Sequence, residues 1–232
     1  MRYNFTQFKN KSYYGGQNGS GHYQKLISMI PACTILVEGF LGYSGVIRNL
    51  NLLPGVIAGF DMDPEVINLW GIDTPENMRL YNADYTRTEA YKGKKGVFFH
   101  YDPPYRNTSS PKKYRFDLKT DAEYERFLYF VTGDMRGETI MISHWQDDLF
   151  DQHLLPAGFH HVPFQTMSRR GMIENGVYMN YDPAVVPLLD YSYCGKDFTD
   201  RQRIKRKVSR TINNIKSFSP EELGLLKQNL VL

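Results

Sequence analysis

Short runs of β-branched and aromatic residues alternate along this chain with segments whose apolar positions recur every three or four residues. The short runs predict strands and the recurring segments predict helices, because these are the periods at which side chains return to one face. Strands are predicted at 34–40, 56–63, 138–145, 158–167 and 176–182, and a strand followed by a turn is predicted within each of 80–85 and 96–105. Helices are predicted between them, at 22–29, 44–50, 64–70, 121–132 and 147–155. Strands separated by helices predict a Rossmann-like, doubly wound α/β sheet, and the last two strands are expected to form an antiparallel hairpin.

Length and composition add that this sheet belongs to an ordinary globular domain. The chain has 232 residues, of which 41% are hydrophobic, enough for one domain with an appendage and too apolar for a disordered chain. Its apolar runs are far shorter than the roughly 18 residues that cross a bilayer, and its start lacks the apolar core of a secretory signal. Cys33 and Cys194 form neither a disulfide framework nor a metal pair. We therefore expect a cytoplasmic protein of a bacterial or phage-infected cell, with no membrane partner and no metal.

The charge is concentrated at the end of the chain. The net charge is +3, but residues 196–216 contain eight Lys or Arg and two Asp, so this segment carries +6 and the rest carries −3. Apolar residues recur every three or four positions in it, which predicts an amphipathic helix. Its outward-facing cations would be Arg201, Lys205, Arg206 and Arg210. A segregated basic segment is typical of a nucleic-acid partner, although a solvated or protein-binding helix is the alternative.

Four predicted strands end in residues that suit a ligand site. The sequences at these ends are EGFLGYSG (38–45), DMD (61–63), NADY (82–85) and DPPY (102–105). In an open α/β sheet, ligands bind outside the carboxyl ends of the strands. A Gly-rich turn lets the backbone approach a ligand, and an acid about 20 residues later, here Asp61, suits the ribose of an adenosine-containing ligand. The alternative is that Asp61 and Asp63 only cap the helix that begins at Pro64.

The DPPY segment carries the most specific chemistry. Two consecutive prolines fix the backbone and remove two donors, so neighbouring carbonyls can accept hydrogen bonds from a ligand amine. If Asp102 and the Pro103 carbonyl each accept one N–H of a base amine, the nitrogen can direct its lone pair at an electrophile, while Tyr105 stacks on the base. The alternative is a rigid proline turn with no ligand.

These motifs resemble those of the Dam-like group of DNA adenine-N6 methyltransferases, which take a methyl group from S-adenosylmethionine. The resemblance covers nearly the whole chain and keeps the motif order of the alpha group. It consists of YYGGQNGSGHYQKLISMIP, LVEGFLGYSG, DMDPEVINLW, NADY and YDPPY, followed by ETIMISHWQDDLFDQHLLPAGFHHV and GVYMNYD. It implies a fold of the class I S-adenosylmethionine-dependent methyltransferase type. The catalytic domain would span 1–195 and a basic helical appendage 196–232.

The resemblance also implies roles for individual residues. Those that would contact the cofactor are Tyr14, Gly15, Gly16, Glu38, Phe40, Gly42, Asp61 and Asp84. Within this set, Asp61 would hold the ribose and Asp84 the cofactor adenine. Those that would hold the target adenine are Asp102, Pro103, Pro104 and Tyr105. Transfer would be a direct displacement without a metal, and a target in duplex DNA would first be flipped out.

The basic loop after DPPY is a second candidate contact with the substrate. Its cations are Arg106, Lys112, Lys113 and Arg115. A polar, basic loop at this position suits closure over a flipped base and contact with phosphates. A plain solvated loop is the alternative.

The chain departs from the family pattern in its cofactor loop and in its length. Gly39 stands where the family has proline, Gln17 where it has lysine, and Gly42-Tyr43-Ser44 replaces Gly-Ser-Gly. Only 21 positions separate Asp63 from Asp84, which leaves no room for the family's target-recognition domain. Sequence readout would then be relaxed or supplied by a partner subunit or homodimer. RNA as the substrate, and a catalytically silent nucleic-acid-binding subunit, are the alternatives to DNA methylation of the phage or restriction-modification kind.

Overall fold

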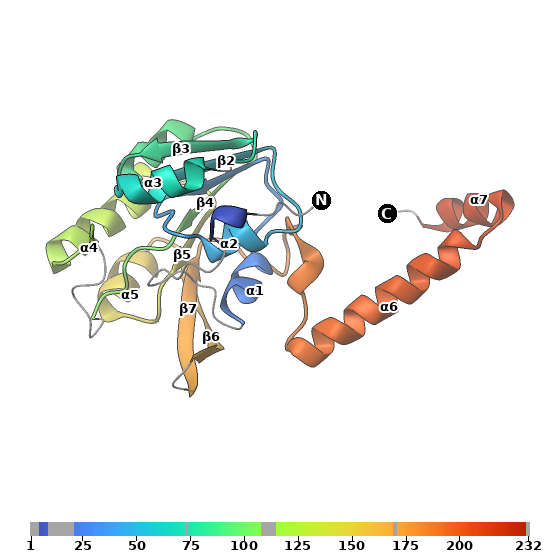
Figure 1. Cartoon of the computed structure of the whole chain (residues 1–232). Coiled ribbons are helices and arrows are strands. Elements are labelled where there is room, and N and C mark those ends of the chain that lie inside the picture. Colours follow the sequence, from blue (N-terminus) through green and yellow to red (C-terminus); the bar gives the residue numbers. More distant parts are fainter. Residues whose placement is uncertain (1–4, 9–20, 73, 108–114, 169–170, 231–232) are drawn as a thin grey trace. The chain divides into compact units, whose positions relative to one another are not determined.

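The computed structural model describes residues 5–8, 21–72, 74–107, 115–168 and 171–230. The chain divides into two compact units, Met1–Asp190 and Tyr191–Leu232 (Figure 1). The sequence placed the boundary five residues later, after 195. We describe each unit by itself.

A seven-stranded sheet forms the centre of the first unit. Its strands, in sheet order, are β3 (Met78–Asn82), β2 (Val56–Asp61), β1 (Ile35–Glu38), β4 (Val97–Tyr101), β5 (Ile140–Ser143), β7 (Gly171–Met179) and β6 (His160–Ser168). The first five run parallel, whereas β7 is antiparallel to both β5 and β6. The predicted Rossmann-like, doubly wound sheet with its closing antiparallel hairpin is therefore confirmed.

Helices connect the parallel strands. Those of the first unit are α1 (His22–Ile27), α2 (Gly45–Asn49), α3 (Pro64–Gly71), α4 (Asp121–Tyr129) and α5 (Asp148–Leu154). Helical turns of other types are η1 (Thr6–Phe8), η2 (Tyr85–Tyr91) and η3 (Phe130–Asp134). The start of α3 is as predicted, with Pro64 in its first turn and the Asp63 carboxylate accepting the Glu65 N–H at 2.9 Å.

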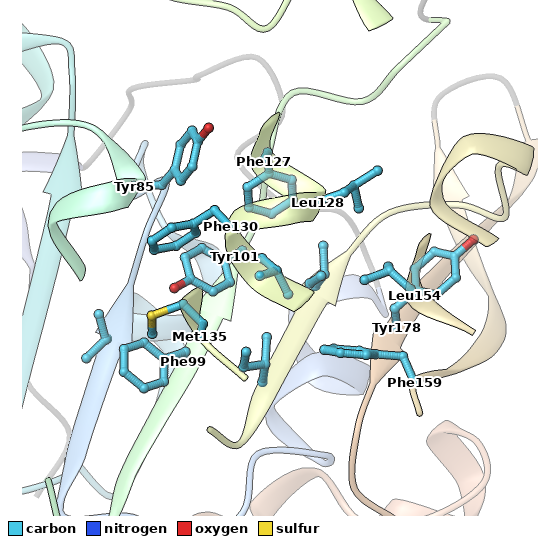
Figure 2. Close-up of a cluster of buried hydrophobic side chains, with 14 of the residues drawn as sticks. Tyr85, Phe99, Tyr101, Phe127, Leu128, Phe130, Met135, Leu154, Phe159 and Tyr178 are labelled. Atoms are coloured by element: carbon cyan, nitrogen blue, oxygen red, sulfur yellow. The ribbon is translucent and has the colours of Figure 1, made fainter. Parts of the chain in front are cut away.

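The core under the candidate site is aromatic. Figure 2 shows side chains of β4 packed against those of α4 and the turn that follows it. Tyr101 is fully buried, with its ring edge-to-face with Phe127 at 5.6 Å and its hydroxyl 2.8 Å from Thr88 Oγ1. Tyr101 immediately precedes Asp102, so a rigid core fixes the strand from which DPPY continues.

The run 80–85 is the end of a strand followed by a turn, as predicted, because β3 ends at Asn82 and Asp84 caps the 3₁₀ turn η2. One strand prediction was wrong in its bounds. The second strand of the hairpin was expected from 176, but β7 begins at Gly171. Residues 171–174 are exposed, so they lack the apolar alternation that core burial imposes on a strand.

The second unit consists of η4 (Tyr191–Tyr193), α6 (Phe198–Lys216) and α7 (Pro220–Asn229). Asp197 caps α6, and Ser219 forms a capping box with Glu222 at the start of α7. The basic segment is thus a helix, as predicted. Val208 and Ile212, two of its recurring apolar residues, are 51% and 46% exposed.

Candidate active site

The sheet brings the loop after β1, the acidic end of β2 and the DPPY segment after β4 to one edge. β1 lies between β2 and β4, and Glu38 is in register with Gly59 on one side and His100 on the other. Because parallel strands end at a common edge, the loop after Glu38 has the end of β2 on one flank and Asp102 on the other. The sequence predicted that these strand ends share one edge, and the structure adds which strands are neighbours.

The loop after β1 is held by hydrogen bonds to both the N–H and the C=O of Gly42. The Gly42 N–H donates to Asp61 Oδ2 at 2.8 Å, and Trp70 Nε1 donates to the Gly42 carbonyl at 2.7 Å. Gly42 has a φ of 44°, in the region where a side chain is unfavourable. The loop is therefore preformed by residues of β2 and α3.

The Asp61 carboxylate does not cap α3. Its Oδ1 accepts the Asp63 N–H at 2.8 Å while Oδ2 holds Gly42. Burial raises the pKa of the Asp61 carboxyl, and these two N–H donors oppose that rise. Each oxygen accepts one backbone donor and keeps capacity for another. Helix capping alone therefore does not account for Asp61, whereas it does account for Asp63.

Gly39 and Phe40 fit the loop onto the core. A Cβ on Gly39 would lie 2.3 and 2.4 Å from Cδ1 and Cε1 of the Tyr101 ring, so a larger residue would displace this buried side chain. Phe40 stacks on Tyr85 with ring centroids 5.4 Å apart and packs edge-to-face on Phe127 at 5.5 Å. The glycine found where the family has proline therefore has a steric reason in this chain.

Glu38, His100 and Ser143 form a buried polar row across three neighbouring strands. His100 Nδ1 lies 3.1 Å from Glu38 Oε1, and His100 Nε2 lies 2.9 Å from Ser143 Oγ. All three residues are at most 2% exposed. Burial lowers the pKa of His100, but the Glu38 carboxylate and Asp102 outweigh it and raise that pKa above its ordinary value. The Glu38 carboxylate, predicted to contact the cofactor, thus binds a histidine of β4.

His144 positions the end of the DPPY segment. Its Nε2 accepts the Arg106 N–H at 3.0 Å, so its Nδ1 carries the proton and donates to the Trp145 carbonyl at 2.8 Å. Burial, the largest cause, lowers the pKa of His144 to about 4. On the other side, the Tyr124 hydroxyl donates to the Pro104 carbonyl at 3.0 Å. The backbone on both sides of Tyr105 is therefore fixed by side chains of β5's end and α4.

Tyr105 itself packs among aromatic rings. Its ring centroid lies 5.0 Å from that of His144 and 5.0 Å from that of Trp145. His144 in turn stacks on Phe150 at 3.9 Å. Neither His144 nor Trp145 was predicted from the sequence to act at the site. The sequence feature that could have indicated their role is Ser143-His144-Trp145, which stands at the end of the predicted strand 138–145.

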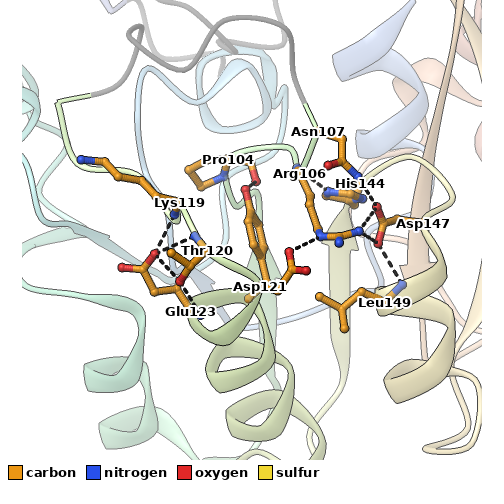
Figure 3. A network of polar contacts seen from close by, with 11 residues as sticks. Pro104, Arg106, Asn107, Lys119, Thr120, Asp121, Glu123, His144, Asp147 and Leu149 are labelled. Atoms are coloured by element: carbon orange, nitrogen blue, oxygen red, sulfur yellow. Dashed lines mark hydrogen bonds and ion pairs between the residues drawn. The ribbon is translucent and has the colours of Figure 1, made fainter.

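Arg106 is held by two carboxylates (Figure 3). Its Nε lies 2.9 Å from Asp121 Oδ1, and its Nη1 lies 3.1 and 3.0 Å from the two oxygens of Asp147. Arg115 pairs with Glu65 at 2.7 Å and lies 3.6 Å from Asp63. A phosphate contact through Arg106 would require these ion pairs to open. The predicted roles of Arg106 and Arg115 in phosphate binding stay predictions.

The remaining predicted site residues lie in different parts of the chain. Asp84 caps η2 by accepting the Thr86 N–H at 3.0 Å, and its contact with the cofactor adenine stays a prediction. The predicted cations Arg201, Lys205, Arg206 and Arg210 belong to α6, in the second unit. Five predicted residues lie outside the described ranges: Tyr14, Gly15, Gly16, Lys112 and Lys113.

Candidate metal sites and membrane-spanning helices are both absent from the part of the chain that the structure describes. No three of its His, Cys, Asp or Glu residues gather closely enough to hold a metal ion. None of its helices combines the length and the apolar character needed to span a membrane.

Comparison with known proteins gives similarities in structure alone. No family model matches the chain, and no curated protein matches it. An rRNA methylase from Streptococcus thermophilus is 10% identical, over 68% of this chain and 93% of that one, with a TM-score of 0.46. A candidate methyltransferase from Streptococcus mutans in complex with SAH is 11% identical, over 67% and 93%, with a TM-score of 0.44. At such identities and TM-scores, neither similarity carries an argument about activity or substrate.

Proposed function

We propose that this chain is an S-adenosylmethionine-dependent methyltransferase that methylates the exocyclic N6 amine of adenine in DNA. The observation that carries the proposal is the position of Asp102-Pro103-Pro104-Tyr105. This segment directly follows β4, beside the Gly42 loop that Asp61 holds. A base-amine site and a nucleoside site are thus neighbours at the edge where ligands bind such sheets.

The residues at the ends of β1 and β2 fit an adenosine-containing cofactor. The Gly42 loop is held before any ligand arrives, so binding would cost little ordering entropy. Each oxygen of Asp61 retains capacity to accept a hydrogen bond, which suits the two hydroxyls of a ribose. When bound, the cofactor supplies an electrophilic methyl group on a positively charged sulfur.

The chain's own contribution would be to orient the target amine. Asp102 and the Pro103 carbonyl would accept its two N–H groups, leaving the nitrogen lone pair directed at the methyl carbon. The methylated amine would then lose one proton, which Asp102, as its hydrogen-bond acceptor, would pass to water. Tyr105 would stack on the base, and the contacts of its neighbours with His144 and Tyr124 keep it in place.

The test is methyl incorporation from labelled S-adenosylmethionine into duplex and single-stranded DNA. We expect transfer to the N6 position of adenine by the wild-type chain, and a loss of at least about 100-fold in Asp102→Ala, because the amine loses its acceptor. Binding of S-adenosylmethionine, measured by calorimetry, should persist in the variant. Mass spectrometry of the digested nucleosides identifies the methylated atom.

Asp134→Ala is the matched control. Asp134 is exposed and lies in the turn between α4 and β5, which enters the opposite edge of the sheet. It should transfer at the wild-type rate. A parallel reaction with RNA distinguishes the two substrates. Methylation of RNA but not of DNA would make RNA the substrate in the proposal. The absence of both transfer and cofactor binding would instead leave a nucleic-acid-binding subunit without catalysis.

A further inference from the structure

The β6–β7 hairpin extends past the end of its neighbour β5. Ser143, the last residue of β5, pairs with Val177 of β7, and β7 is antiparallel, so its earlier residues lie beyond the carboxyl end of β5. Residues 171–175 of β7 pair there with 164–168 of β6. We call these two segments the arm. Five residues at about 3.3 Å each make it about 16 Å long, and Figure 1 shows the hairpin reaching beyond the neighbouring strands.

The arm projects from the edge that carries DPPY. β4 and β5 are parallel neighbours, and β7 follows β5 in the sheet. With strands about 4.8 Å apart, β7 lies about 10 Å from β4. The arm therefore begins about 10 Å across the sheet from the strand that leads into Asp102, and it points in the same direction as the end of that strand.

One face of the arm is covered and anchored. Phe164, Thr166 and Asn175 are at most 9% exposed. The Asn175 side chain donates to Thr166 Oγ1 at 2.6 Å, and the Phe164 ring packs edge-to-face with His22 of α1 at 5.5 Å. These contacts hold the arm to the first unit over part of its length.

The end of the arm exposes apolar side chains. Met167 and Met172 are directly opposite each other and are 53% and 58% exposed, and neighbouring Ile173 is 45% exposed. On the face that carries Met167 and Met172, the next pair is Gln165 and Glu174. The Gln165 side-chain amide donates a hydrogen bond to the Glu174 carboxylate at 3.3 Å. An exposed apolar pair at the tip of a projecting ribbon marks a surface that binds something. Arg169 and Arg170 join the two segments in the sequence and lie outside the described ranges.

We propose that the arm contacts the nucleic-acid substrate beside the target base, with Met167 and Met172 packing against flanking bases. The inference rests on the proposed function. Successive nucleotides of a strand are about 3.4 Å apart, so a strand whose adenine lies at Asp102 brings nucleotides three to five steps away to the arm. A two-stranded ribbon fits a nucleic-acid groove, and methionine is among the residues that wedge between base steps.

A second copy of this chain is the competing occupant of the arm. Stable interfaces bury about 800 Å² on each partner and engage 20 to 30 residues a side, by general survey. Three exposed apolar residues at a hairpin tip supply far less than that. Contact with flanking bases, in contrast, requires only a small apolar surface, because the strand would already be held at the target adenine.

Two measurements on the full chain test the arm without relying on methyl transfer. The first places the photo-cross-linker p-benzoylphenylalanine at position 172, or at exposed Leu155 as control, and irradiates the protein with labelled duplex DNA and with RNA. The second measures duplex binding by fluorescence anisotropy for Met167→Ser/Met172→Ser. Its control is Leu52→Ser/Leu155→Ser, at similarly exposed positions in loops that enter the opposite edge.

We expect a nucleic-acid adduct from position 172 and none from 155, and about tenfold weaker binding by the arm variant with the control unchanged. Thermal unfolding should show both double variants folded. A missing adduct, unchanged binding, or a chain-to-chain adduct would each overturn the inference. Methyl transfer is measured separately. Adducts and weakened binding without any methyl transfer would support the inference about the arm and refute the proposed catalysis.

Discussion

Single residues fix the geometry of the candidate active site through contacts that are remote in sequence. Gly39 is required because the Tyr101 ring occupies the space of its side chain, 62 positions later. Gly42 meets a different requirement, a positive φ with both its N–H and C=O held. The two glycines look equivalent in the sequence, but Gly39 is required by side-chain packing and Gly42 by backbone conformation.

His144 makes a testable contribution of the same kind. Its pKa of about 4 is below the ordinary 6.5, so between these values the unfolded chain binds a proton that the folded chain does not. The free energy of unfolding should therefore fall as the pH falls from about 6.5 to 4, by up to about 3 kcal/mol from this residue. His144→Gln keeps an acceptor for Arg106 and should remove this residue's share of the pH dependence, as measured by urea unfolding at each pH. His22, whose pKa is also lowered to about 4 by partial burial, keeps its own share.

His153 serves as the control for that experiment, because it lies on α5 and its ring packs on Tyr129. His153→Gln should leave the wild-type pH dependence in place. If His144→Gln and the wild-type chain lost the same stability over this range, the neutral, accepting state of His144 would be refuted.

Among the secondary-structure elements, α4 and α5 converge on the residue that follows DPPY. Arg106 reaches Asp121 at the start of α4 and Asp147, the cap of α5. Tyr124 of α4 adds its hydrogen bond to Pro104. Two helix starts and the end of β5 thus determine where the segment leaves the sheet, which the sequence did not indicate, since it assigned Arg106 to phosphate.

The two carboxylates should contribute unequally. Asp147 is 6% exposed at its side chain and Asp121 is 67% exposed, so water screens the second pair much more than the first. Asp147→Asn should lower the free energy of unfolding by about 2 kcal/mol, because Arg106 loses its buried charged partner. Asp121→Asn should cost clearly less. Chemical denaturation compares them, and equal losses would contradict this ranking.

The whole molecule separates a mildly acidic sheet unit from a basic helical one. The segment 196–216 carries +6 and the rest of the chain −3, and the structure places nearly all of that segment in α6. Asp200 pairs with Arg203 at 2.7 Å. The outer positions Lys205, Arg206 and Arg210 are exposed. We propose that α6 supplies nonspecific affinity for the phosphate backbone, while a partner subunit or second copy could supply recognition.

Neutralising α6 tests that role. Arg206→Gln/Arg210→Gln should weaken nucleic-acid binding and reduce the slope of log affinity against log salt by up to about two, because each lost phosphate contact releases one counterion fewer. Lys95→Gln/Arg136→Gln removes the same charge from exposed turns that lead into β4 and β5 and should leave the slope unchanged. Titrations by fluorescence anisotropy at several salt concentrations measure both. An identical slope in the α6 variant and the wild type would exclude phosphate contact by these residues.

The sequence by itself determined the sheet, its helices and the edge at which the strand ends with candidate ligand-binding residues meet. The reason is that the hydrophobic period and the order of the segments dictate parallel strands joined by helices. It also identified DPPY and the Gly-rich loop. Only the tertiary structure decided which side chains hold these segments. Asp61 binding Gly42, Glu38 binding His100 and His144 accepting from Arg106 join residues 19 to 62 positions apart, and local patterns do not encode such pairs. The β7 half of the arm, residues 171–175, escaped prediction for a related reason, since a strand that extends beyond the core loses the burial pattern by which strands are recognised.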